Sequence, residues 1–307
     1  MHKIMIAAIL SGVIALGALS AAAQDDAGRF AKVQINSTDL GSGIYMLTGA
    51  GGNMGLSTGA DGAILIDDEF APLSERIRAA IGKLGKTPVH YLVNTHWHGD
   101  HTGGNAHFGE AGAVIVAQDN VRKRLSTDQF MKAFKRTTKA APAIAWPVIT
   151  FNDEISFYQN GQTIHVFHVK NAHTDGDSMI YFEPADVLHT GDVLFNKMYP
   201  FIDTGSGGSI DGMIAAQERA LALVTDTTKI IPGHGPLATR ADLAHNLAML
   251  KAVRTAVLKT IAEGKSVDEA VAADPLKALN EEWGGGFIKA EQMVRLVYGD
   301  LSRKSRD

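Results

Sequence analysis

The stretch NTHWHGDH, at positions 94–101, places three histidines and one aspartate close together in a chain that has 12 histidines in total. His96, His98, Asp100 and His101 follow one another at spacings of two, two and one. Neutral imidazole and ionised carboxylate suit zinc, iron or manganese. Alternate residues of an extended loop point to similar sides, so His96 and His98 can face one cation while the other two face a neighbouring one. The alternative, a polar surface turn, has to account for all four ligand types, and we favour metal binding.

The chain contains no cysteine. Thiolate ligands, thiolate nucleophiles and disulfides are therefore excluded, and any metal site has to be built from His, Asp and Glu.

Three further candidates each follow a predicted strand in a polar or glycine-flanked loop. They are His173 in NAHTDGD, Asp192 in HTGDVLF and His234 in IPGHGP. Each is unremarkable alone. Together with the first four residues they supply enough ligands for two metal positions.

The elements that would position these residues alternate along the chain. The motif begins just after an apolar strand at 89–94, and loops at strand ends commonly present functional groups on a rigid scaffold. Hydrophobic periodicity and turn signals predict strands at 63–66, 113–117, 155–158, 163–169, 179–182, 187–190 and 229–231, and helices at 72–84, 120–139, 211–224, 240–263 and 289–301. This mixture predicts an α+β fold with two mixed sheets packed together and helices outside.

The composition is that of a globular protein. The 307 residues are 45% hydrophobic and 20% charged, with a net charge of −4. That length is enough for one large domain or two small ones. There is no basic run that would neutralise phosphates, so we expect a small-molecule substrate and no nucleic acid.

The N-terminal segment 1–23 has a basic start, an apolar run and a small-residue end, AAA. This layout predicts a cleaved secretory signal, a periplasmic or secreted protein with no stable membrane association, and a mature domain at 24–307 with a C-terminal helical tail. The alternative is an uncleaved membrane anchor. The oligomeric state is left open.

The joint motif resembles the signature of the metallo-β-lactamase superfamily, H-x-H-x-D-H followed by a distant His, an Asp and a last His. The resemblance runs from GIYMLTGAGGN to PGHG. It implies a four-layer αβ/βα sandwich, with two Zn²⁺ per chain, or iron or manganese in their place. It also implies that the first metal is held by His96, His98 and His173, the second by Asp100, His101 and His234, and that Asp192 bridges them.

The resemblance further implies hydrolysis of an activated acyl bond. Two neighbouring cations can share a water and lower its pKa towards 7, and Asp100 would aim the resulting nucleophile. A β-lactam-type cyclic amide is the favoured substrate because export separates the protein from glutathione thioesters inside cells. A thioester or lactone is the alternative, since an aspartate at position 192 resembles glyoxalase II and lactonase members.

Three more residues are candidates for supporting roles. Lys197 could pair with a substrate carboxylate and Tyr199 could wall the pocket, although a solvated lysine and a packing tyrosine are the simpler alternatives. Asp67 resembles a family position that hydrogen-bonds a metal ligand. The alternative for Asp67 is a turn or capping aspartate.

Other functions compete with hydrolysis. A mononuclear iron sulfur dioxygenase shares the H-x-H-x-D-H frame, whereas His98 argues against a flavodiiron protein. A non-catalytic metal-binding protein is a third possibility, although no ligand of the set is missing. Acidic charge and export argue against a nuclease.

The remaining histidines are not expected to bind metal. His165 and His168 lie on opposite faces of a strand, so they cannot serve one site together. The histidines without partners at useful spacing are expected to be structural or on the surface: His90, His107, His189 and His245.

Overall fold

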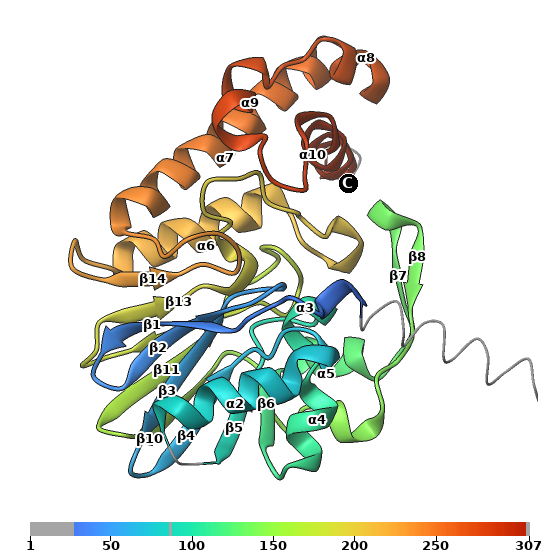
Figure 1. Cartoon of the computed structure of the whole chain (residues 1–307). Coiled ribbons are helices and arrows are strands. Elements are labelled where there is room, and N and C mark those ends of the chain that lie inside the picture. Colours follow the sequence, from blue (N-terminus) through green and yellow to red (C-terminus); the bar gives the residue numbers. More distant parts are fainter. Residues whose placement is uncertain (1–27, 86–87, 305–307) are drawn as a thin grey trace, which may run out of the picture.

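The computed structural model describes residues 28–85 and 88–304. The predicted signal segment at 1–23 lies outside these residues. Two sheets face each other between layers of helices (Figure 1). This arrangement confirms the predicted four-layer fold. In the described part of the chain, no helix has the length and apolar character needed to cross a membrane.

The first sheet has seven strands in the order β1-β2-β3-β4-β5-β6-β9. Its first four strands pair antiparallel, and β4, β5, β6 and β9 pair parallel. The strands are β1 (Asn36–Gly41), β2 (Ile44–Thr48), β3 (Met54–Gly59), β4 (Gly62–Ile66), β5 (Val89–Val93), β6 (Val114–Gln118) and β9 (Ile149–Phe151).

The second sheet has five strands in the order β10-β11-β12-β13-β14. Its strands pair antiparallel except for the parallel pair β13 and β14. They are β10 (Glu154–Gln159), β11 (Gln162–His168), β12 (Ser178–Phe182), β13 (Val187–His189) and β14 (Lys229–Ile231).

Strand β4 shows how the sequence builds the layers. Successive side chains of a strand point to opposite faces. Ile64 and Ile66 pack between the two sheets, with Val166 and Ile180 of the second sheet. Leu65 points the other way, into the cluster beneath the helices. A strand buried on both faces therefore reads as a continuous apolar run, as AILI does.

Helices cover the outer faces of both sheets. The first sheet carries α2 (Ser74–Leu84) and α4 (Asn105–Glu110), whose Ile77 and Phe108 pack on it. The second carries α6 (Ile210–Leu223), α7 (Arg240–Ala262) and α10 (Ala290–Lys304). The described chain also has four shorter helices: α3 (Gly99–Thr102), α5 (Asp119–Leu125), α8 (Val267–Ala272) and α9 (Lys277–Trp283).

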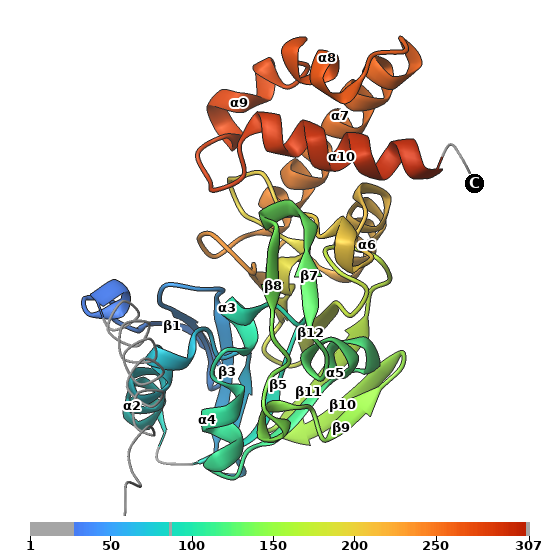
Figure 2. The same cartoon turned by 90° about the vertical axis from the view of Figure 1, so that its right-hand side faces the viewer.

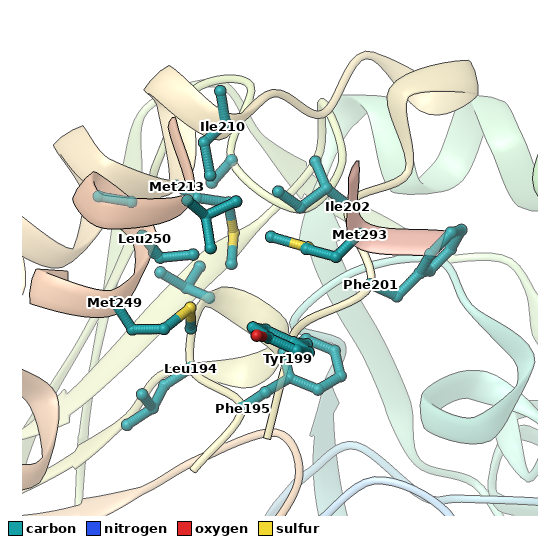
Figure 3. Close-up of a cluster of buried hydrophobic side chains, with 14 of the residues drawn as sticks. Leu194, Phe195, Tyr199, Phe201, Ile202, Ile210, Met213, Met249, Leu250 and Met293 are labelled. Carbon is teal, nitrogen blue, oxygen red and sulfur yellow. The ribbon is translucent and has the colours of Figure 1, made fainter. Parts of the chain in front are cut away.

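The C-terminal helices share the core of the second sheet. Thr239 and Asp242 form a reciprocal capping box that begins α7. Leu250 of α7 and Met293 of α10 pack in one cluster with Met213 of α6 (Figure 3). The predicted C-terminal tail therefore packs against the same core as the second sheet, whose strands precede His173, Asp192 and His234.

The helix predicted at 120–139 is wrong beyond its first turns. Helix α5 ends at Leu125, and the chain then forms a two-stranded hairpin, β7 (Gln129–Met131) and β8 (Arg136–Thr138). Asp128 closes the base of the hairpin by accepting hydrogen bonds from Lys139 Nζ and from the Ala140 amide. The hairpin stands upright between the helices of the first sheet and those of the C-terminus (Figure 2).

Candidate metal centre

The H-x-H-x-D-H stretch leaves strand β5 at the carboxyl end of the first sheet. His96 and His98 lie on the loop after Val93, and Asp100 and His101 lie on the short helix α3 (Gly99–Thr102). The Thr95 amide donates to Asp67 Oδ1 at 2.8 Å, which fixes the start of the loop. All three histidines of the stretch are buried.

The remaining three candidates leave strands of the second sheet. His173 follows β11, Asp192 lies in a 3-10 turn after β13 (Gly191–Val193), and His234 follows β14. Parallel β13 and β14 end side by side, which brings the last two residues together across about 40 positions of sequence. The two sheets therefore present their loops to the same place.

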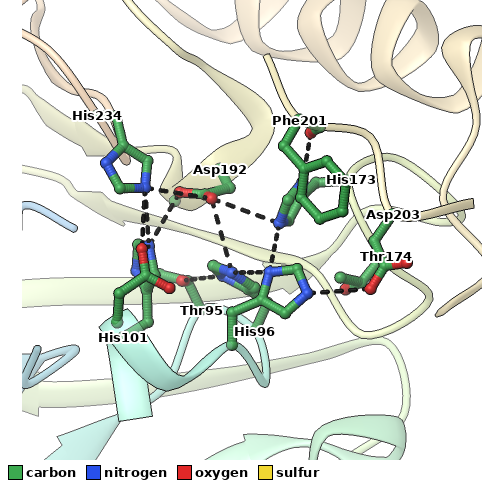
Figure 4. A network of polar contacts seen from close by, with 12 residues as sticks. Thr95, His96, His101, His173, Thr174, Asp192, Phe201, Asp203 and His234 are labelled. Carbon is green, nitrogen blue, oxygen red and sulfur yellow. Dashed lines mark hydrogen bonds and ion pairs between the residues drawn. The ribbon is translucent and has the colours of Figure 1, made fainter. Parts of the chain in front are cut away.

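The structure divides the seven residues into two groups whose potential ligand atoms lie within 4.8 Å of one another. The first contains His96, His98, His173 and Asp192, and the second contains Asp100, His101 and His234. In the first group, Nδ1 of His98 lies 3.2 Å from Nε2 of His96 and 2.8 Å from Nε2 of His173. Figure 4 shows the His96 and His173 rings of this group pointing toward Asp192.

Asp192 contacts both groups. Its Oδ1 lies 3.1 Å from Nε2 of His101, and its Oδ2 lies 3.4 Å from Nε2 of both His173 and His234. Oδ1 is buried and accepts no hydrogen bond from the described residues. The carboxylate thus stands between the two groups, the position that the resemblance implies for a bridge.

Hydrogen bonds at the outer side of each ring fix where its proton lies. His173 Nδ1 donates to the Phe201 carbonyl at 2.7 Å, and His101 Nδ1 donates to Asp67 Oδ2 at 2.7 Å. Thr95 gives its hydroxyl proton to the same Asp67 oxygen and therefore accepts from Nδ1 of His96. In His96 and His173 the nitrogen that faces the centre is therefore left as an acceptor.

Converging acceptor nitrogens repel one another unless a cation lies between them. Buried polar atoms are normally paired, and here the inner nitrogens of the first group have mainly each other as neighbours. A donor set of imidazole nitrogens and carboxylate oxygens, without thiolates, suits zinc, manganese or iron. The residues present therefore fit two cations of this class.

The two groups differ in charge when no cation is bound. Burial lowers the pKa of His96 well below its usual value and that of His173 to about 4, so these two imidazoles of the first group are neutral at neutral pH. Burial also works against charge on His234, but Asp192 and Asp100 outweigh it and raise its pKa to about 9. The second group therefore holds protons at neutral pH where it would otherwise hold a cation.

Asp203 is a functional residue that the sequence did not reveal. Its Oδ2 accepts from Nε2 of His98 at 3.0 Å, which leaves Nδ1 of that ring facing the centre. Its Oδ1 caps a 3-10 turn by accepting from the amides of Gly205 and Ser206. The pattern DTGS can be predicted as a turn cap, but nothing in it points to a histidine 105 positions away.

A glycine-rich loop seals the second group from one side. Glu69 is fully buried and accepts from the amides of Ala50 and Gly51. The next residue, Gly52, lies so close to the His101 ring that a β-carbon there would overlap it. Glycine is thus required by close approach at this position.

Asp67 lies where the resemblance placed it, against a ligand-type histidine. The structure places Lys197 and Tyr199 differently from the expectation. Tyr199 is completely buried in the hydrophobic cluster with Phe195 and Met249, because the chain turns inward after Lys197. Lys197 is exposed, and neither residue is among those that line the cleft over the metal centre.

Four of the other described histidines contact scaffold or surface groups. His189 is buried, donates from Nε2 to the Asn53 carbonyl and accepts from the Gly191 amide. His107, His165 and His245 each contact a surface glutamate.

A cleft of about 650 Å³ opens over the centre. Asp100, Asp192 and His234 form its floor, with Trp97 and His98 beside them. Its walls are mainly apolar and come from the N-terminal segment, the loop after β4, the hairpin, the segment between β13 and α6, and the loop before α10. The apolar wall residues are Phe30, Phe70, Pro72, Met131, Phe134, Phe201 and Phe287.

Comparisons with known proteins agree with this geometry. A sequence profile described as "Metallo-beta-lactamase superfamily" matches residues 47–234. The chain is 27% identical over 169 residues to a hydroxyacylglutathione hydrolase from Nitrosococcus oceani, covering 53% of the chain and 55% of that protein. It is 24% identical over 220 residues to the 2,4-dinitroanisole O-demethylase subunit alpha of a Nocardioides species, covering 68% of the chain and 60% of that protein. The chain therefore spans about half the length of the curated relatives it matches.

Among solved structures, DIM-1 metallo-beta-lactamase superposes with a TM-score of 0.58 and 18% identity, covering 72% of this chain and 99% of that one. A metallo-beta-lactamase from Pontibacter korlensis gives a TM-score of 0.56 and 22% identity, covering 71% and 99%. At these identities the likeness shows the fold alone.

Proposed function

Because the chain belongs to the metallo-beta-lactamase superfamily, we propose that it is a metal-dependent hydrolase that cleaves an activated acyl bond of a small molecule. One observation carries the proposal. Seven ligand-type residues from two sheets converge in two groups, with Asp192 between them. Two divalent cations held there would supply Lewis acidity and activate a water molecule for attack.

Asp100 has the position and charge to orient that water. Its side chain is 30% exposed, on the floor of the cleft, and its Oδ2 lies 3.3 Å from Nε2 of His234. Burial would raise the pKa of Asp100, but His101 and His234 hold it well below its usual range. The carboxylate is therefore ionised at neutral pH and can accept a hydrogen bond from the attacking water.

The apolar walls of the cleft serve the same reaction in two ways. They exclude bulk water around the scissile bond, which strengthens electrostatic interactions there. They also give an apolar acyl group a surface on which to pack beside the floor. His234 is held by stacking on Phe195 at 5.0 Å between ring centroids, so the floor is rigid on that side.

A β-lactam-type cyclic amide is the first substrate we propose, supported by the predicted export of the chain. A thioester is the second candidate, and the observation that favours it is the identity to hydroxyacylglutathione hydrolase.

The test is a panel of chromogenic lactam, lactone, thioester and ester substrates, assayed after reconstitution with zinc, manganese or iron. We expect hydrolysis of the lactam by the wild-type protein and none by His96→Ala that has the same far-ultraviolet circular dichroism. Undiminished turnover by the variant would remove the site assignment. Bound iron with oxygen uptake and no hydrolysis would replace hydrolysis with oxidation.

A further inference from the structure

Two arginines line the cleft, and no carboxylate in the described part of the chain pairs with either of them. Arg29 and Arg136 are both exposed and belong to the cleft walls. The carboxylates among the lining residues are Asp100 and Asp192, which belong to the metal centre. Within residues 28–85 and 88–304, neither guanidinium forms an ion pair; Arg29 lies over the Phe30 and Phe70 rings, at 4.8 and 5.0 Å.

The register of the hairpin directs Arg136 towards the cleft. Residues directly opposite each other in an antiparallel pair share a face of the ribbon. Arg136 lies opposite Met131, and Phe130 lies opposite Thr137. Met131, Arg136 and Thr138 line the cleft, whereas Phe130 is on the other face and is 60% exposed. The ribbon therefore has one face that belongs to the cleft and one that does not.

Aromatic side chains stand beside these cations on the cleft rim. Phe134, at the tip of the hairpin, contacts Phe201, with ring centroids 5.0 Å apart. Phe287, from the loop before α10, faces Phe195 across 6.4 Å. Phe134 and Phe287 are 46% and 53% exposed, which is an unfavourable position for phenyl groups unless a ligand covers them.

The cleft combines apolar rings with guanidinium groups that no described carboxylate pairs, which matches a ligand that has both an apolar part and an anionic group. Arginine presents a planar fork of donors that fits a carboxylate in a bidentate manner. A neutral apolar ligand would cover the rings but leave the guanidinium groups without a partner.

We propose that the substrate is an aryl- or alkyl-acyl compound that carries a carboxylate, and that Arg136 is the residue that selects for this carboxylate. Phe134 and Phe287 would cover the apolar group. The inference rests on the proposed function for the position of the scissile bond, over the floor formed by Asp100 and His234.

Two pairs of variants test the proposal on the metal-loaded protein. Arg136→Gln is compared with Lys135→Gln, which removes the same charge from the neighbouring exposed residue that does not line the cleft. Phe134→Ala is compared with Phe130→Ala, which lies on the opposite face. The substrates are aryl-acyl thioesters and lactams in matched forms, one with a carboxylate and one with a carboxamide in its place.

We expect the wild-type protein to prefer the carboxylate form in kcat/KM. Arg136→Gln should lower this preference about tenfold, whereas Lys135→Gln should change it less than about twofold. Phe134→Ala should lower kcat/KM for both forms alike, and Phe130→Ala should not. An unchanged preference in Arg136→Gln, or an equal loss in Lys135→Gln, overturns the proposal.

A binding measurement separates this inference from the proposed function. Calorimetry compares 4-phenylbutyrate with 4-phenylbutanamide on the wild-type protein, Arg136→Gln and Lys135→Gln. If no substrate is hydrolysed but Arg136→Gln alone weakens 4-phenylbutyrate, hydrolysis is refuted and the carboxylate site stands. If hydrolysis occurs and neither variant affects 4-phenylbutyrate, hydrolysis stands and the carboxylate site is refuted.

Discussion

Replacing Asp203 with asparagine tests how the protein prepares His98 to bind a metal. Asp203 is 3% exposed, and its Oδ2 accepts from Nε2 of His98 at 3.0 Å. Asparagine keeps an acceptor for the amides of Gly205 and Ser206 but places an NH₂ group against His98. Two donors cannot face each other, so the imidazole proton moves to Nδ1, the atom that faces the other ligands. The inner nitrogen is then no longer free to bind a cation.

The expected loss can be bounded. Replacing the partner of a metal-ligating histidine typically weakens metal binding by about 10- to 100-fold, which corresponds to about 1.4 to 2.7 kcal/mol. The hydrogen bond is charge-assisted and buried, which favours the upper half of that range. Asp203→Ala should add a loss of unfolding free energy, since it also removes the cap of the 3-10 turn.

The assay is a competition titration with a chromophoric chelator, which resolves the affinities for the first and second equivalents of zinc. Asp39→Asn is the matched control, because Asp39 is exposed and also accepts from an amide two residues on, that of Gly41. We expect the control to bind zinc as the wild-type protein does. Wild-type affinity for both equivalents in Asp203→Asn would refute the role assigned to the carboxylate.

Three further perturbations follow from the same geometry. Asp192→Ala should bind less than two equivalents of zinc, as measured by elemental analysis, and should lose hydrolysis. Circular dichroism should show that it remains folded. Two tightly bound equivalents would contradict a bridging position. Gly52→Ala should displace the His101 ring and abolish activity, whereas Gly82→Ala, where a β-carbon meets nothing within 4 Å, should leave kcat/KM unchanged. In the metal-free protein the raised pKa of His234, about 9, stabilises the fold fully below its unfolded value of about 6.5 and progressively less as pH rises to about 9. Urea unfolding of the metal-free protein should show this decline from about pH 7.5 to 9, a range above the unfolded pKa of the buried His96 and His173, whose lowered pKa values act in the opposite direction at lower pH. Equal stability across that range would contradict it.

Much of the site could be predicted because its ligands lie at the ends of strands. A strand is recognisable from its apolar run, and the loop after it is the usual place for functional groups. His96 and His98 after β5 and His234 after β14 follow this rule. Apolar runs also predict the layers of the fold, since the continuous run AILI predicts a strand that is buried on both faces.

The hairpin shows where local pattern fails. Residues 120–139 contain enough apolar positions at helical spacing to predict one helix, but the chain folds back at Lys135, which has a positive φ of 49°. Pairing of β7 with β8 and the contact of Phe134 with Phe201 outweigh the weak helical preference. Because the prediction missed this turn, it also missed Arg136 as a wall of the cleft.

The amino-acid sequence determined the types of ligand, their order, and the strands that end beside them, because strand formation and metal chemistry depend on residues that are near one another in the chain. Only the tertiary structure decided that Asp203 would meet His98, that Tyr199 would enter the core, and that Arg136 would face the centre. Such contacts join residues distant in sequence, and their geometry depends on how two sheets and a hairpin pack, which no local pattern encodes.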